Sequence, residues 1–122
     1  MIEKLPELVN GDAVLVRRGR WLTTRFMVEV GETQYLVSVR AGRIEGVETG
    51  PFVMAPWSFA IRAAADIWER FWQPLPEPGY SDIFALLRTG RIVFDGDLQP
   101  MMANLLYIKG VLAAPRTLGD KP

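Results

Sequence analysis

Apolar residues recur mostly at every second position between residues 13 and 48. This period is typical of β-strands with one buried face, so the first half of the chain is predicted to form a sheet. Turn signals at residues 18–20, 31–32 and 41–42 separate the strands. Consecutive hairpins of this kind form an antiparallel meander, and its inner face needs a cover. The expected strands span residues 13–17, 22–30, 34–40 and 43–48.

The second half of the chain changes its period at Asp66, after a further alternating segment over residues 58–65. That segment is predicted to be a fifth strand, and apolar spacing beyond it predicts three helices and a last strand. Ser81 or Asp82 is placed to cap the second of these helices, as Asp66 and Asp97 are for the first and third. The expected helices span residues 66–72, 82–89 and 98–109, and the last strand spans 91–95. We expect one α+β domain over residues 1–122, with residues 115–122 loose because they have nothing to bury.

The chain of 122 residues carries 14 basic and 14 acidic residues and has no cysteine or histidine. Proteins that bind nucleic acid usually carry an excess of positive charge, and this chain has none. No nucleic-acid partner is therefore expected. The absence of cysteine and histidine excludes disulfides, thiolate nucleophiles, serine–histidine dyads and imidazole-ligated metals. One local group of arginines is interpreted as a solvated sheet edge rather than an anion site. It consists of Arg17, Arg18, Arg20 and Arg25.

The first residues lack the charged-then-apolar order of a signal peptide, and no apolar run approaches the ~18 residues of a membrane span. The last three residues, Asp120-Lys121-Pro122, are not a peroxisomal signal. We therefore expect a cytoplasmic protein with no transmembrane segment.

Aromatic and methionine residues gather on the predicted helices. Trp68, Phe71 and Trp72 share one helix face, and Met101 and Met102 lie on the apolar stripe of the last helix. Both groups fit an ordinary core. However, these stripes give more apolar faces than one sheet obviously absorbs, and aromatic-lined concavities are the usual sites for apolar ligands. The sequence leaves three alternatives open: a core, a ligand cavity, or a surface for a partner.

The carboxylates give weak signals for catalysis or metal binding. Asp95 and Asp97 are spaced to share a hard metal ion, but no third ligand follows, so a turn with a helix cap is favoured. Asp66 and Glu69 fit a cap and its return hydrogen bond better than an acid–base pair. Arg62 is flanked by apolar residues, and outward exposure is favoured over contact with a ligand carboxylate. No catalytic residue, cofactor or metal is expected.

Residues 58–114 resemble the sterol carrier protein type 2, or sterol-transfer, domains in the order and spacing of their elements. A strand runs into Asp66-Ile67-Trp68, a second helix ends in Gly90, and the sequence Gly-Arg-Ile-Val-Phe-Asp-Gly-Asp over residues 90–97 leads into the final apolar helix. The resemblance implies a five-stranded, mainly antiparallel sheet with three or more helices packed on one face around an apolar tunnel. It also implies that a sterol, fatty acid or acyl chain is bound without chemical change. By position, the implied tunnel lining is Phe59, Ile61, Trp68, Phe71, Trp72, Ile83, Phe84, Leu87, Met101, Met102, Leu105 and Leu106.

The chain departs from these domains at two places. Members usually begin with a long helix, whereas here residues 1–10 precede the first predicted strand and Pro6 interrupts them. This departure predicts a pocket that is open on one side or closed by a second subunit, in a homodimer. The loop over residues 74–79 resembles an insertion that is able to act as a lid.

Three functional hypotheses follow. The leading one is a non-enzymatic carrier that binds an apolar small molecule, such as a lipid, fatty acyl chain or sterol-like compound, between sheet and helices. The second is a protein-interaction or dimerisation module with no cavity. The weakest is a small hydrolase or isomerase that uses carboxylates such as Asp66 and Glu69.

Overall fold

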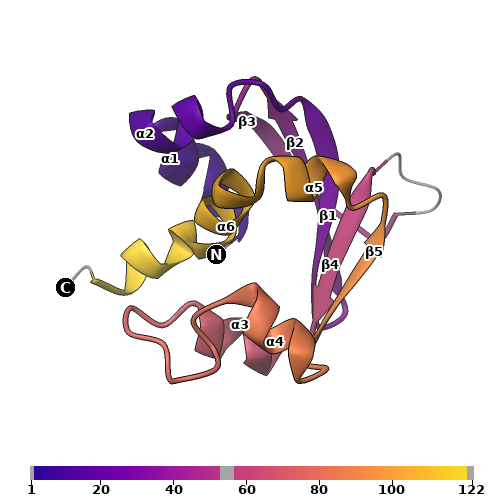
Figure 1. The fold of residues 1–122 in the computed structure, drawn as a ribbon, viewed down its shortest axis with the longest axis vertical. Coiled ribbons are helices and arrows are strands. Elements are labelled where there is room, and N and C mark those ends of the chain that lie inside the picture. The colour runs from indigo at the N-terminus through magenta and orange to yellow at the C-terminus, as the bar shows by residue number, and fades with distance from the viewer. Residues whose placement is uncertain (1, 53–56, 121–122) are drawn as a thin grey trace.

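The computed structural model of the protein describes residues 2–52 and 57–120 and contains a five-stranded sheet (Figure 1). The strand order is β3-β2-β1-β4-β5; β1 and β4 are parallel, and all other neighbours are antiparallel. The predicted α+β class with a mainly antiparallel five-stranded sheet is confirmed. The strands are β1 (Thr24–Val30), β2 (Thr33–Arg40), β3 (Arg43–Thr49), β4 (Phe59–Ala63) and β5 (Ile92–Gly96).

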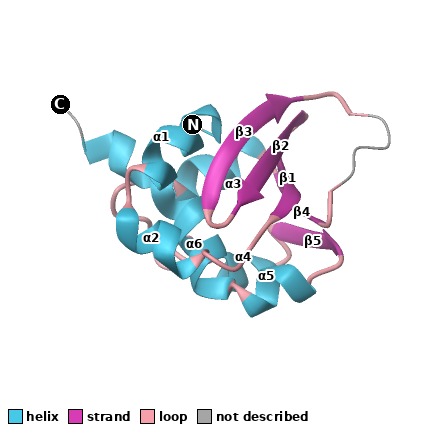
Figure 2. Cartoon of the chain, turned by 90° about the horizontal axis from the view of Figure 1, so that it is seen from above, coloured by secondary structure: helices cyan, strands magenta, loops and turns pink. Residues whose placement is uncertain are grey.

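The helices lie on one face of the sheet, as Figure 2 shows. In Figure 1, α1, α2, α5 and α6 cover the upper part of that face, and α3 and α4 cover the lower part. Among the described helices, none combines the length and the apolar character needed to cross a membrane. The helical elements are η1 (Ile2–Lys4), α1 (Leu5–Asn10), α2 (Ala13–Arg18), α3 (Ala65–Phe71), α4 (Ile83–Arg88), α5 (Gln99–Ala103), α6 (Leu105–Ala113) and η2 (Ala114–Asp120), where η marks a 3-10 helix.

The core fills the space between the sheet and the helices. Phe26 on β1 and Phe59 on β4 are register partners, and their rings stack with centroids 5.1 Å apart. At the edge of the sheet, Phe94 of β5 meets Phe84 of α4 edge-on, with centroids 5.8 Å apart. Such ring pairs stabilise packing beyond the area that they bury. The first pair joins β1 to β4 within the sheet, and the second joins α4 to β5.

Residues 13–17 form the helix α2, so the strand predicted there is wrong. The run Ala13-Val14-Leu15-Val16 is apolar throughout and fits either a helix or a strand. The side chain of Asp12 decides between them, because it accepts a hydrogen bond from the Leu15 backbone nitrogen at 3.2 Å and caps the helix. Only Leu15 of this helix is buried, and Val14 is exposed.

Pro6 lies in the first turn of α1 and does not interrupt a helix, contrary to the prediction. Its missing N–H is not needed at that position. At the other end of α1, the side chain of Asn10 pairs with the backbone of Ile44 on β3. Its Nδ2 donates to the Ile44 carbonyl at 2.9 Å, and its Oδ1 accepts from the Ile44 nitrogen at 2.8 Å. The N-terminal segment therefore covers the β3 end of the sheet.

The predicted helix caps are correct in part. The N-cap of α3 is Ala64, and no side chain caps this helix, so the predicted Asp66 cap is wrong. Asp82 is the N-cap of α4 and its side chain accepts from the Phe84 nitrogen at 3.5 Å, as predicted. The N-cap of α5 is Leu98, not Asp97 as predicted, although the Asp97 side chain accepts from the Gln99 nitrogen at 3.1 Å.

The C-terminal part of the chain also differs from its prediction. The predicted third helix is divided at Asn104 into α5 and α6. Beyond it, η2 occupies residues expected to have nothing to bury. Pro115 is buried, and Arg116 donates from Nε to the Phe71 carbonyl at 2.7 Å and from Nη2 to the Ser81 carbonyl at 2.9 Å. These bonds attach η2 to the segment between α3 and α4.

Candidate ligand pocket

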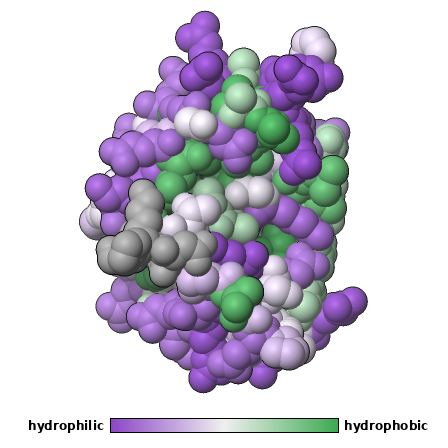
Figure 3. Space-filling model, turned by 90° about the vertical axis from the view of Figure 1, so that its left-hand side faces the viewer, coloured by the Kyte–Doolittle hydropathy of each residue, from purple (hydrophilic) through white to green (hydrophobic). Residues whose placement is uncertain are grey.

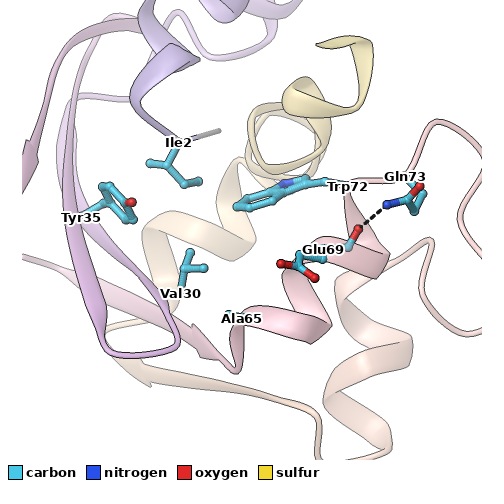
Figure 4. A pocket seen from close by; sticks show the side chains of 7 residues that line it. All are labelled: Ile2, Val30, Tyr35, Ala65, Glu69, Trp72 and Gln73. Atoms are coloured by element: carbon cyan, nitrogen blue, oxygen red, sulfur yellow. Dashed lines mark hydrogen bonds between the residues drawn. The ribbon is translucent and has the colours of Figure 1, made fainter. Parts of the chain in front are cut away.

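A hollow of about 300 Å³ opens between η1, the β1–β2 hairpin and α3 (Figure 4). It exists because Gly31 turns the chain between β1 and β2 while the Gly31 nitrogen donates to the Ala63 carbonyl, which brings the start of α3 beside the hairpin. Gly31 has a φ of 62, a conformation that favours glycine. The lining residues are Ile2, Val30, Tyr35, Ala65, Glu69, Trp72 and Gln73.

Trp72 provides the largest apolar surface of this pocket. Its side chain is 6% exposed, and its ring stacks on Trp68 with centroids 5.1 Å apart. The indole nitrogen of Trp72 donates to the Leu112 carbonyl at 2.8 Å, and that of Trp68 donates to the Glu29 carbonyl at 2.9 Å. Because both polar atoms already have partners, the Trp72 ring offers the pocket an apolar face.

The polar groups of the pocket lie at its edge. Gln73 donates from Nε2 to the backbone carbonyl of Glu69 at 3.0 Å, and both side chains are exposed. Opposite them in Figure 4 is Tyr35 of β2, which is half-buried. Burial raises the pKa of the Tyr35 hydroxyl above its ordinary value, and the negative charge of Glu3 raises it further. The hydroxyl therefore stays protonated at neutral pH and is able to donate a hydrogen bond.

Of the twelve residues implied as a tunnel lining, Trp72 is the one that lines this pocket. Seven of the twelve pack in the core, and no tunnel between sheet and helices is seen within residues 2–52 and 57–120. These seven are Phe59, Ile61, Trp68, Phe71, Trp72, Ile83 and Met101. The other five are half-buried or exposed at the surface, namely Phe84, Leu87, Met102, Leu105 and Leu106.

A second hollow, of about 370 Å³, brings together three of the implied lining residues, Phe71, Ile83 and Leu106. Three cationic side chains line it, and two of them, Lys109 and Arg116, contact other residues of the protein. Lys109 forms an ion pair with Asp82 at 3.2 Å, and Arg116 lies 4.4 Å from the centre of the Phe71 ring while bonding two carbonyls. This arrangement is typical of a structural contact between α4, α6 and η2.

The carboxylates considered in the sequence analysis lie at the surface or in ion pairs of the described residues. Asp66 and Glu69 are both exposed, and only Glu69 lines the pocket. Within residues 2–52 and 57–120, no group of three or more acidic side chains is arranged to hold a metal ion. Arg62, for which the sequence favours outward exposure, is half-buried and bonds Glu29 at 3.0 Å and Asp95 at 2.7 Å. The bond to Asp95 is the largest of the effects that raise the pKa of Arg62.

Sequence reasoning missed most of the pocket. Val30 and Tyr35 follow the alternation that marks the inner face of the sheet, so the sequence predicts that they point inward. The place of Ile2 and Ala65 in the lining is not predictable from the sequence, because it depends on how η1 and α3 dock against the hairpin. Glu69 is singled out by sequence chiefly as the partner of an Asp66 cap, and that role does not predict a place in a pocket.

No protein-family model matches this sequence, and no curated protein matches it. Solved structures do match in fold. A crystal structure of sterol carrier protein 2 aligns with a TM-score of 0.74 at 12% identity, over 94% of this chain and 92% of that one. The ubiquinone synthesis protein UbiJ-SCP2 aligns with a TM-score of 0.60 at 18% identity, over 95% and 88% of the two chains. The apo form of sterol carrier protein 2 from Yarrowia lipolytica gives 0.59 at 11%, over 94% and 86%. The chain therefore has the sterol carrier protein 2 fold.

Proposed function

We propose that this protein binds an apolar ligand, such as a lipid, acyl chain or sterol-like molecule, and releases it chemically unchanged. The observation that carries the proposal is the face of Trp72 in the pocket, because the ring is available to a ligand while its nitrogen is occupied by Leu112. Apolar surface removed from water stabilises a complex by roughly 25 cal/mol per Å². The shared fold with sterol carrier protein 2 supports the same proposal.

The charge of the pocket favours a ligand whose exposed end is uncharged. Among the described residues of its lining, Glu69 is the one charged side chain, and none is a cation. A fatty-acid carboxylate at this edge meets a like charge, which weakens binding. A ligand hydroxyl or carbonyl accepts a hydrogen bond from the protonated Tyr35 instead. A neutral lipid is therefore the preferred ligand class.

The size of the pocket bears on how a long ligand is held. A volume of about 300 Å³ is at the lower end for ligand sites. A longer apolar chain needs further space, and the core beside Trp72 contains Trp68 and Phe71 of the implied lining. We propose that the tail of the ligand enters there as the side chains shift, and that the twelve residues named from the resemblance line the bound state. Met101, with its flexible thioether chain, suits such a rearrangement.

The first test is native mass spectrometry of the purified protein, with organic extraction of any released molecule. The protein is then incubated with cholesterol and, separately, with oleate. A bound neutral lipid near one per chain supports the proposal. An apo mass that survives both incubations overturns it, and if that mass belongs to a dimer, it favours the interaction module instead.

A pair of variants locates the site. Ala65 lines the pocket and is exposed, so Ala65→Trp fills the pocket without replacing a core residue. Ala64 is its exposed neighbour outside the lining, which makes Ala64→Trp a matched control. We expect Ala65→Trp to lose lipid uptake at least tenfold and Ala64→Trp to keep it. Equal uptake by the two variants places the ligand elsewhere.

A further inference from the structure

The end of the molecule farthest from the pocket carries an unusual surface, which we call the Trp21 patch. It consists of Arg17, Arg20, Trp21, Arg40 and Arg43, all of them exposed. Two segments meet there, the end of α2 and the turn between β2 and β3, and both lie at the top of Figure 1. Figure 3 shows hydrophilic residues at both the upper and the lower end of the molecule, with hydrophobic residues exposed between them.

The contact between these two segments is close and fixed. A side chain on Gly42 would meet the Val16 carbonyl and the Gly19 backbone, so the turn packs directly on the end of α2. The Gly42 nitrogen also donates to the Leu22 carbonyl at 3.2 Å. Arg40 and Arg43 flank this turn as register partners. The fold therefore brings arginines from two separate segments together, and Arg17 lies on the helix α2 rather than on a sheet edge as predicted.

The arginines of the patch form no ion pair within the described part of the chain. The ion pairs seen among the described residues involve Arg62 and Lys109, and none of them involves an arginine of the patch. Arg20 lies 5.3 Å from the centre of the Trp21 ring and donates to the Arg17 carbonyl, so its bonds leave the charge in place. In a chain with 14 basic and 14 acidic residues, this is a marked local excess of positive charge.

Trp21 adds an apolar element to this charge. Its side chain is 82% exposed, whereas Trp68 and Trp72 are buried. An exposed tryptophan among arginines suits the boundary between lipid headgroups and acyl chains, where the ring enters the apolar layer and its N–H stays near water. Basic residues add attraction to anionic headgroups.

We propose that the Trp21 patch docks this protein on the surface of a membrane that contains anionic phospholipids. The patch is the tip of a turn and a helix end, which fits a flat surface better than the long groove that a nucleic-acid strand needs. The proposal does not depend on the ligand pocket, because the two sites lie at opposite ends of β1 and β2. A protein without lipid uptake is still able to bind vesicles.

The test is binding of the full chain to vesicles at low ionic strength. Vesicles of phosphatidylcholine alone are compared with vesicles that also contain phosphatidylglycerol, by co-sedimentation and by tryptophan fluorescence. We expect binding to the mixed vesicles only, a blue shift from Trp21, and weaker binding as salt is added. Binding that is equal on both vesicle types, or absent from both, overturns the proposal. So does binding to an oligonucleotide without binding to vesicles.

Two double variants separate position from net charge. Each arginine near an anionic surface strengthens binding about fivefold. The variant Arg17→Glu with Arg20→Glu should therefore lose about twentyfold or more, and Trp21→Ala should lose the blue shift. The control is Arg88→Glu with Arg91→Glu, which changes the net charge equally at exposed positions by α4 and the start of β5. Equal losses in the two double variants, with both folded by circular dichroism, overturn the proposal.

Discussion

The hydroxyl of Tyr107 on α6 donates a hydrogen bond to the carbonyl of Gly42 at 2.8 Å, inside the protein. The ring of the same tyrosine lies where a side chain on Gly19 would stand. One buried residue therefore holds together α6, the end of α2 and the turn between β2 and β3. The geometry of the Trp21 patch depends on this contact.

Tyr107→Phe tests the hydrogen bond. The variant leaves the buried Gly42 carbonyl without its partner, which should lower the free energy of unfolding by about 1–3 kcal/mol in urea titrations. Tyr35→Phe is the control, because no hydrogen bond of the Tyr35 hydroxyl is seen within the described part of the chain, and its effect should stay within about 0.5 kcal/mol. Equal losses contradict the assignment.

Stability at high pH should depend on the same residue. Burial raises the pKa of Tyr107 well above its ordinary value of 10.0. The unfolded state thus releases this proton first, so the stabilising effect is complete below pH 10 and is lost as the pH rises above it. The difference in unfolding free energy between the wild type and Tyr107→Phe should shrink above pH 10. A difference that stays constant to higher pH contradicts the prediction.

Two glycines give a matched pair of substitutions. A Cβ on Gly19 would lie 2.4 Å from the Tyr107 ring, whereas a Cβ on Gly46 meets nothing within 4 Å. Gly19→Ala should therefore destabilise the protein by about 1–3 kcal/mol, as overpacking does. Gly46→Ala should be neutral or slightly stabilising, because alanine restricts the unfolded chain. Thermal unfolding measures both, and the reverse order is incompatible with the packing described.

Glu69→Lys tests the ligand class proposed for the pocket. The substitution changes the one charge of the lining, and the side chain is exposed, so the fold should be retained. We expect the ratio of oleate binding to cholesterol binding to rise at least about fivefold, since a like charge is replaced by an opposite one. Competition measured by native mass spectrometry gives this ratio. An unchanged ratio indicates that the polar end of the ligand lies away from Glu69.

The sheet was the part of the fold most readable from sequence. Alternation places Phe26, Val28 and Tyr35 on one face, and this pattern has few structural alternatives once the turns are recognised. The run at residues 13–16 was misassigned because it is apolar at every position, so the period carries no information there. Asp12 was the better signal, since an aspartate just before such a run is typical of a helix N-cap.

The pocket was less predictable than the fold. Trp72 was found because aromatic residues at helical spacing mark an inward face. The same spacing selected Trp68 and Phe71, which pack in the core, because periodicity shows which side of a helix is apolar and not whether a ligand or a protein side chain covers it. Ile2 and Ala65 reach the pocket through the docking of separate elements, and no local sequence pattern predicts such a contact.

The parallel pairing of β1 with β4 joins two strands that are far apart in the sequence. Strands β1, β2 and β3 pair with their neighbours along the chain, whereas Phe26 and Phe59 meet only after the intervening meander has been placed. Bringing β1 and β4 together closes a long segment of chain, and this costs conformational entropy before the contacts between the strands form. Non-local pairing of this kind slows folding. We therefore expect the pairing of β1 with β4, rather than the hairpins, to limit the refolding rate of the domain.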